Sequence, residues 1–343
     1  MNSMKRLVWR GGVELRMEHG PGPPPSPRED EVLLKVRAVG ICGTDIHIMN
    51  GAIPSAKPPM ILGHEVSGEI AAAGSGVTNV REGDRVTLDA VVGCGHCPRC
   101  KRGSPQFCAE GFEFGISRDG GCQDYLVVPR HNVYRIADSV SFEEAAILDM
   151  EVYNAVRNCR IEKGDCVLVL GAGPIGLIAC QVARILGAAH IVLSDLLKSR
   201  LDAAQAIGIA NVYLPAAESG SGAELGNAES GEMFDVVVDC AGTANSTRHA
   251  FKVVRPGGRI LLYGVYEHAI DHLDLNQLVL KDLTVVGAQS DRNGWEDVIA
   301  LVTSGALNLR KLITHRLPLE EGQAAFNLVR NREQAVIKAV LLV

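Results

Sequence analysis

The sequence predicts an α/β protein in two parts, a mostly β part followed by a doubly wound α/β domain with a parallel sheet. Up to about residue 150, short strand patterns are separated by Gly and Pro. After about residue 152, continuously apolar strands alternate with glycine turns and helical patterns, which is typical of a parallel sheet covered on both faces. The chain of 343 residues is long enough for both parts.

In the first part, strand patterns cover residues 31–42, 64–74 and 83–92. Residues 21–27, PGPPPSP, suit neither a helix nor a central strand, because proline has no backbone N–H and a fixed φ. We therefore expect a β domain whose loops carry the functional side chains.

In the second part, the apolar runs predict buried strands within residues 166–170, 190–194, 234–242, 258–264 and 283–289. The small, polar segment 216–231 is predicted to be a surface excursion, and 295–308 a helix. Residues 335–343 predict a strand that rejoins the first part. The predicted domains are therefore residues 1–152 with 290–343, and residues 153–289.

Composition narrows the class of protein and its location. The net charge of −6 gives no reason to expect nucleic acid as a partner. No apolar run is long enough to cross a membrane, and the first twenty residues lack the apolar core of a signal peptide. We therefore expect a cytoplasmic protein with no membrane partner, in which the ten cysteines are reduced.

The hexamer GAGPIG predicts a dinucleotide site, because it follows a strand pattern and opens a helix pattern. The first glycine permits the tight turn, the second lets a pyrophosphate approach, and the third allows close packing of helix and strand. The free N–H groups of the helix then face the phosphates. The predicted contacts are Gly171, Gly173, Pro174, Ile175 and Gly176. A purely structural glycine turn is the alternative.

Asp195 ends the next predicted strand, where a carboxylate accepts hydrogen bonds from the hydroxyls of the adenosine ribose. A 2′-phosphate at this place would meet a like charge, which favours NAD over NADP. Lys198 and Arg200 lie nearby and would soften that repulsion, and Arg200 is therefore counted among the cofactor contacts.

The stretch CGHCPRCKRGSPQFC contains Cys94, Cys97, Cys100 and Cys108. This spacing suits a closed site of four thiolates around a structural zinc ion. A redox CxxC centre is the first alternative, but it needs only two cysteines. A nucleic-acid zinc ribbon is the second, and the acidic chain disfavours it.

A second set of candidate metal ligands lies upstream. GICGTDIHIMNG supplies Cys42, Thr44 and His47, and GHEVSGE supplies His64 and Glu65. Cys and His at separate loop positions, without a complete quartet, suit a catalytic zinc ion with an open position. Spacing alone leaves an accidental Cys–His pair equally open.

These motifs resemble those of the zinc-dependent medium-chain dehydrogenases, the alcohol and polyol dehydrogenase family. The similarity is carried by GICGTDIH, GHEVSGEI, GDRV, the four cysteines, LGAGPIG and Asp195, and it spans almost the whole chain. It implies a GroES-like catalytic domain, a Rossmann domain, and a homodimer or homotetramer.

The resemblance also implies roles for individual residues. Cys42 and His64 would be ligands of the catalytic zinc, and Glu65 a neighbouring carboxylate or an alternating ligand. Thr44 would touch the substrate hydroxyl and His47 would continue the proton path to solvent. Lys338 lies where the family carries a basic contact to the pyrophosphate, although a surface lysine is an open alternative.

The remaining zinc ligand of the family comes from a region that here reads FEEAAILDMEVYNAVRN. Matching forward from FEE indicates Asp149, whereas matching backward from YNAV indicates Glu151. A third alternative is that neither binds and a water molecule takes the position. The region has no cysteine at these positions, unlike simple alcohol dehydrogenases of the family.

The predicted function is therefore oxidation of a secondary alcohol in a polyol, sugar alcohol or cyclitol to the ketone, with NAD and two zinc ions per chain. An amino-alcohol dehydrogenase resembling L-threonine 3-dehydrogenase is the alternative within the enzyme class. The third reading is a non-catalytic family member that only binds nucleotide.

Overall fold

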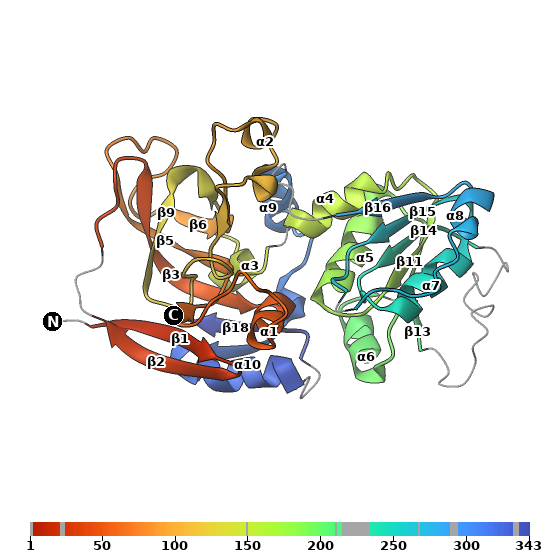
Figure 1. Ribbon diagram of the computed structural model, residues 1–343. Coiled ribbons are helices and arrows are strands. Elements are labelled where there is room, and N and C mark those ends of the chain that lie inside the picture. The colour runs from red at the N-terminus through yellow and green to blue at the C-terminus, as the bar shows by residue number, and fades with distance from the viewer. Residues whose placement is uncertain are drawn as a thin grey trace. The chain divides into compact units, whose positions relative to one another are not determined.

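A computed structural model of the chain describes residues 3–20, 25–148, 150–209, 211–214, 233–266, 268–288, 294–331 and 336–343. Figure 1 shows two units, which are treated separately below. The first unit consists of Met1–Leu148 and Asp291–Val343, and the second of Asp149–Ser290.

A seven-stranded sheet is the centre of the first unit, with strand order β10-β6-β5-β3-β18-β17 and β9 paired with β3. Its strands are β3 (Glu31–Ile41), β5 (Glu65–Ala73), β6 (Arg85–Leu88), β9 (Tyr125–Pro129), β10 (Val133–Arg135), β17 (Ile313–Pro318) and β18 (Lys338–Leu342). The predicted C-terminal strand is β18, which pairs antiparallel with β3 from Ala339 opposite Ile41. Segments from both ends of the chain therefore form one sheet.

Smaller sheets and helices complete the first unit. Strands β1 (Met4–Gly11), β2 (Glu14–Gly20) and β4 (Met60–Ile61) form one sheet, and β7 (Val91–Val92) pairs with β8 (Phe112–Glu113). The α-helices are α1 (Gly43–Met49), α2 (Pro98–Lys101), α3 (Phe142–Ala146), α9 (Trp295–Thr303) and α10 (Gly322–Asn331). Short 3₁₀ helices cover Pro105–Phe107, Arg130–Asn132, Arg310–Leu312 and Leu319–Glu321.

Helix α9 ends earlier than the predicted helix 295–308. Gly305 has a φ of +76°, in the left-handed region that closes a helix, and the N–H of Gly305 donates to the carbonyl of Val302. Leu307 and Leu309 continue the apolar pattern of the helix and are buried, but they belong to the segment after the helix.

The second unit is a doubly wound domain with six parallel strands in the order β13-β12-β11-β14-β15-β16. They are β11 (Cys166–Leu170), β12 (His190–Ser194), β13 (Val212–Tyr213), β14 (Phe234–Asp239), β15 (Val254–Leu262) and β16 (Thr284–Gly287). The helices are α4 (Met150–Asn158), α5 (Pro174–Leu186), α6 (Lys198–Ala206), α7 (Ala244–Val253) and α8 (Asn276–Leu280), labelled in Figure 1. The predicted excursion 216–231 lies outside the described residues.

Apolar burial explains the order of these strands. Val167, Leu168 and Val169 of β11 are fully buried, as are Val236, Val237 and Val238 of β14. Such strands are covered on both faces, so they take the central positions of a parallel sheet. The carboxyl ends of the strands, where ligands bind in this architecture, therefore lie along one edge.

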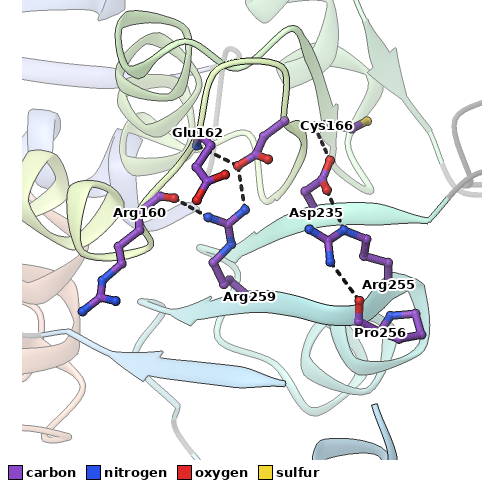
Figure 2. A network of polar contacts seen from close by, with 8 residues as sticks. Arg160, Glu162, Cys166, Asp235, Arg255, Pro256 and Arg259 are labelled. Atoms are coloured by element: carbon purple, nitrogen blue, oxygen red, sulfur yellow. Dashed lines mark hydrogen bonds and ion pairs between the residues drawn. The ribbon is translucent and has the colours of Figure 1, made fainter. Parts of the chain in front are cut away.

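A polar network holds together the amino-terminal halves of β11, β14 and β15 (Figure 2). Arg255 Nε donates to Asp235 Oδ1 at 2.6 Å, and the N–H of Cys166 donates to Asp235 Oδ2 at 2.7 Å. Arg259 donates to Asp165 Oδ2 at 2.7 Å and to the carbonyl of Arg160. This network lies opposite the edge that carries the glycine hexamer.

No helix among the described residues is long and apolar enough to cross a membrane.

Candidate functional site

The pairing of β3 with β5 brings together the first set of predicted ligands. Gly40 of β3 lies opposite Glu65 of β5, so Cys42, just after β3, is close to His64, just before β5. One ligand atom from each of Cys42, His64 and Glu65 lies within 4.8 Å of the others. We call these three residues the Cys–His–Glu trio.

Asp45, which the sequence interpretation did not select, supports the trio from behind. It is fully buried in α1, and its Oδ2 accepts a hydrogen bond from the N–H of Cys42 at 2.9 Å. Asp45 Oδ1 lies 3.6 Å from His64 Nδ1, which is an electrostatic contact rather than a hydrogen bond. Nε2 is then the nitrogen of His64 that remains for a metal ion.

Burial lowers the pKa of His64, but the negative charge of Asp45, with a smaller contribution from Cys42, outweighs it and leaves that pKa well above 6.5. A signal for Asp45 was present in the sequence. An acidic residue three positions after the residue that begins a helix is a capping position, and Asp45 has this relation to Cys42.

Glu65 is held by a lysine from the far end of the chain. Lys338 Nζ of β18 donates to Glu65 Oε1 at 2.5 Å, and the two side chains are only 7% and 17% exposed. Gly40 makes room for this carboxylate, because a Cβ at Gly40 would lie 2.0 Å from Glu65 Oε2. Lys338, predicted as a pyrophosphate contact, thus contacts Glu65 in this structure.

The trio fits a zinc ion by the chemistry of its donors. Thiolate, imidazole nitrogen and carboxylate oxygen are the groups that zinc binds in proteins. Glu65 Oε2 is buried and has no hydrogen-bond partner among the described residues, which is costly for a carboxylate oxygen unless a cation accompanies it. With three protein donors, a fourth position remains for another ligand.

Helix α1 carries the other two predicted catalytic residues, Thr44 and His47. Thr44 Oγ1 lies 3.6 Å from Cys42 Sγ, and His47 follows one turn later on the same helix. The structure thus brings Thr44 next to Cys42. Asp149 lies outside the described residues, and Glu151 stands in the first turn of α4 in the second unit.

The second set of ligands, the four-cysteine lobe (residues 94–108), also converges. The four Sγ atoms lie within 4.8 Å of one another, with 4.0 Å between Cys94 and Cys100 and 3.9 Å between Cys97 and Cys108. A tetrahedron with Zn–S bonds of ~2.3 Å requires S–S distances of about 3.8 Å. The lobe therefore fits a zinc ion, and all ten cysteines of the chain are free of disulfides.

Backbone N–H groups point at these sulfurs, as expected for thiolates. Cys97 N donates to Cys94 Sγ at 3.3 Å, and Cys100 N donates to Cys97 Sγ at 3.4 Å. The N–H of Cys100 is the main cause that lowers the pKa of Cys97 to about 7, whereas burial raises that of Cys100 to about 11.

Each glycine of the hexamer meets the steric demand predicted for it. Gly171 has a φ of +100°, which favours glycine in this turn. Gly173 precedes α5 and has open space where a Cβ would stand, as an approaching ligand requires. A Cβ at Gly176 would lie 1.8 Å from the carbonyl oxygen of Gly171, so only glycine allows this close packing.

Asp195 lies next to this loop. Its Oδ2 accepts from the N–H of Ala172 at 2.7 Å, and Arg200 Nη1 is 3.6 Å from the same oxygen. The side chain of Asp195 is 8% exposed. The carboxylate of Asp195 is therefore held next to the glycine loop, and the guanidinium of Arg200 lies beside it.

Two family models match the chain. Residues 28–138 match a model described as the alcohol dehydrogenase GroES-like domain, and residues 174–304 match one described as zinc-binding dehydrogenase. Among curated proteins, the L-threonine 3-dehydrogenase of Yersinia pestis (strain Pestoides F) is 36% identical over 318 residues, which covers 90% of this chain and 92% of that protein.

Solved structures agree with this match over the whole length. A putative zinc-binding dehydrogenase from Sinorhizobium meliloti 1021, bound to NADP, is 28% identical with a TM-score of 0.90 and full coverage of both chains. The 2R,3R-butanediol dehydrogenase of Bacillus subtilis is 26% identical with a TM-score of 0.89, covering 99% of this chain and 100% of that one. The predicted fold, a GroES-like domain combined with a Rossmann domain, is confirmed.

Proposed function

The chain belongs to the zinc-dependent medium-chain dehydrogenases, and we propose that it transfers a hydride from a secondary alcohol of a polyol, sugar alcohol or cyclitol to NAD, giving the ketone. The observation that carries this proposal is the Cys–His–Glu trio, in which a carboxylate stands beside one thiolate and one imidazole. A carboxylate oxygen is a hard ligand, whereas a second thiolate would be a soft one. A metal ion with a hard ligand beside it suits substrates that are rich in oxygen.

When bound at the trio, zinc supplies the Lewis acid that lowers the pKa of the substrate hydroxyl. The chain's own residues then have distinct tasks in the proposal. Cys42 and His64 hold the ion, and Asp45 fixes the ring of His64. Thr44 accepts the hydroxyl proton as it gives up its own, and His47 passes a proton on to solvent. Asp149 or Glu151 would complete the ligand set, or a water molecule would take that position.

The four-cysteine lobe is proposed to hold a second, structural zinc ion. Four thiolates fill all tetrahedral positions, so no substrate can bind there. The measurement is the zinc content of the purified protein, expected to be about two atoms per chain. One atom per chain would favour the non-catalytic reading.

NAD is the proposed cofactor because of the charge at Asp195. The carboxylate of Asp195 accepts a hydrogen bond from Ala172 in the glycine loop, and at this place it can accept hydrogen bonds from the two hydroxyls of a ribose. A 2′-phosphate would meet this charge at close range, although Arg200, 3.6 Å away, offsets part of the repulsion. The Sinorhizobium meliloti structure shows that the fold also accepts NADP, so the test compares both cofactors.

An amino alcohol is the second candidate substrate, and one observation favours it. The threonine dehydrogenase of Yersinia pestis shares 36% identity with the chain, compared with 26% for the butanediol dehydrogenase. The same trio and proton path would serve both substrates, so the two candidates differ only in what the pocket recognises.

The deciding experiment is the initial rate of cofactor reduction over a panel of simple alcohols, linear polyols, cyclitols and L-threonine, each with NAD and with NADP. A strong rate on one polyol or cyclitol with NAD is the expected result. Activity confined to L-threonine would replace the first candidate by the second. If protein with both zinc ions oxidises none of these compounds, both candidates are rejected.

A cytoplasmic location and self-association complete the proposal. The ten free cysteines suit a reducing compartment.

Strand β16 is an outer strand of the second sheet, and an exposed sheet edge is a surface on which another copy can pair. Apolar side chains that are at least 60% exposed precede this strand, namely Val265, Leu275, Val279 and Leu280. A second copy of the chain is the proposed occupant of this edge.

A further inference from the structure

A buried carboxylate at the end of β14 organises the chain around it. Asp239 is fully buried, and its Oδ1 accepts hydrogen bonds from the N–H groups of Ala241 and Gly242 at 3.0 and 3.3 Å. Its Oδ2 accepts from the hydroxyls of Ser246 and Thr247, both at 3.0 Å. These donors offset the cost of burying a carboxylate that has no ion-pair partner among the described residues.

Tyr266, in the segment after β15, joins this network through its hydroxyl. Its hydroxyl lies 2.8 Å from Thr247 Oγ1 and 3.3 Å from Asp239 Oδ2. The Tyr266 hydroxyl has one proton, which it donates either directly to Asp239 Oδ2 or, when Thr247 donates to Asp239, to Thr247 Oγ1. Burial, with a contribution from the charge of Asp239, raises the pKa of Tyr266 above 10.0, which keeps the phenol protonated as a donor.

The network fixes two loops against each other, residues 240–243 after β14 and residues 263–266 after β15. The N–H groups of Tyr263 and Gly264 both donate to the carbonyl of Asp239 at 3.0 Å. A Cβ at Gly264 would lie 2.3 Å from the backbone nitrogen of Gly242, so the two loops pack backbone to backbone. The side chain and the carbonyl of Asp239 thus hold both loops.

These loops stand where the fold binds its cofactor. They follow the carboxyl ends of two neighbouring strands, and β14 also pairs with β11, which carries the glycine loop. In doubly wound sheets the dinucleotide binds outside these ends, with its phosphates on the first loop. The phosphates are assigned to the glycine loop, so the loops after β14 and β15 are left for the nicotinamide half.

We propose that Tyr266 is a positioning residue for cofactor binding, which acts through Thr247 and Asp239 to hold loops 240–243 and 263–266 in the conformation that receives the nicotinamide half. This inference rests on the proposed function, because it requires that the chain binds NAD. Tyr266 makes its contribution before the cofactor arrives, by reducing the freedom of the free loops. It should therefore change affinity more than the rate of the chemical step.

The test is the variant Tyr266→Phe in the full zinc-loaded enzyme. We expect the Kd of NADH, measured by fluorescence titration, and the KM for NAD to rise about fivefold to tenfold, as for the loss of one net hydrogen bond to a charged network. We expect kcat to stay within about twofold, since the reacting atoms are untouched. A higher KM for NAD with an almost unchanged kcat is a result that general destabilisation of the protein would not produce.

Companion variants make the network itself testable. Thr247→Val should weaken NADH binding to a similar degree, and combining it with Tyr266→Phe should add little, because both remove the same chain of hydrogen bonds. Thr247→Ser keeps the hydroxyl and should restore binding. Tyr213→Phe is the matched control, since Tyr213 belongs to the same unit and its hydroxyl takes no part in this network.

The outcomes separate this inference from the proposed function. If the wild-type protein binds neither NADH nor NADPH, the proposed function fails. If the wild type binds NADH and Tyr266→Phe binds it equally well, the inference about Tyr266 is overturned. A fall in kcat with unchanged affinity would also overturn it, because Tyr266 would then act on the reaction itself.

Discussion

Asp45 lies outside the proposed ligand set and contacts two of its members. It is fully buried, accepts a hydrogen bond from the backbone of Cys42 and lies 3.6 Å from the ring of His64. One carboxylate therefore fixes the positions of two proposed ligands at once. Groups behind metal ligands orient them and raise their basicity.

Replacing Asp45 by Asn should reduce the affinity of the trio for zinc by about 10-fold to 100-fold, because the amide carries no charge toward His64. Competition with a chelator, followed by metal analysis, measures this change. Asp165→Asn is the control, because Asp165 is similarly buried but lies in the second unit. Equal retention of zinc in Asp45→Asn and in the wild type would contradict the role assigned to Asp45.

The ion pair between Lys338 and Glu65 is the second prediction at this scale. Both side chains are largely buried, so Lys338→Met leaves a buried carboxylate without its cation and should destabilise the apoprotein by about 3–5 kcal/mol. Urea unfolding of the metal-free protein measures the loss. Lys198→Met breaks a pair with Asp202 whose side chains are 73% and 54% exposed, and it should cost less than about 1 kcal/mol. Similar losses in both variants would refute the prediction.

At the scale of elements, the network around Asp235 ties β11 and β15 to β14 (Figure 2). Burial raises the pKa of Asp235, but the N–H of Cys166 and the guanidinium of Arg255 together lower it below 3.8. The unfolded chain then binds a proton at higher pH than the folded one. The stability from this group is complete above the unfolded value and is lost as the pH falls through the folded value.

Asp235→Asn should therefore be less stable than the wild type at pH 7 by about 1 kcal/mol, a modest loss because the pair is partly exposed. The difference should shrink below about pH 4, where the wild-type carboxylate takes up its proton. Thermal unfolding of both proteins at several pH values measures this. A difference that stays constant down to pH 2 would exclude the assigned cause.

At the scale of the whole molecule, the edge of the second sheet bears on assembly. Leu280 is 84% exposed and Val279 73% exposed, and both shortly precede the outer strand β16. Leu280→Glu should shift the protein toward monomers, because a charge replaces apolar surface that a second copy would cover. Sedimentation velocity measures the shift. Val13→Glu is the control, since Val13 is an exposed residue of the first unit. If wild type and Leu280→Glu sediment alike, this surface is not the interface.

Much of the fold was predictable because its signals are local. Continuous apolar runs identified β11, β12 and β14, and the glycine hexamer identified the turn before α5. The end of α9 was predicted too late, because the apolar pattern continues into Leu307 and Leu309 after the helix has closed at Gly305. The periodicity of buried residues does not reveal where the backbone leaves the helix.

The candidate site was predictable where the spacing of residues in a motif indicates the ligands. It was less predictable where a residue's neighbours come from distant parts of the chain. The spacing of the four cysteines sufficed to expect their convergence. The contact between Lys338 and Glu65 joins residues 273 positions apart and follows only from the pairing of β18 with β3. The Asp239–Tyr266 contact likewise depends on two loops meeting after separate strands.

The place of β18 in the first sheet also sets an order of events during synthesis. The strands of the second unit follow one another without interruption, so this unit can form its complete sheet while translation continues. The first unit has to wait for β18, which follows the second unit in the chain, before β3 gains that neighbour and Glu65 its lysine. The nascent chain therefore completes its second unit before its first, and limited proteolysis of chains stalled on the ribosome before residue 336 should find only the second unit resistant.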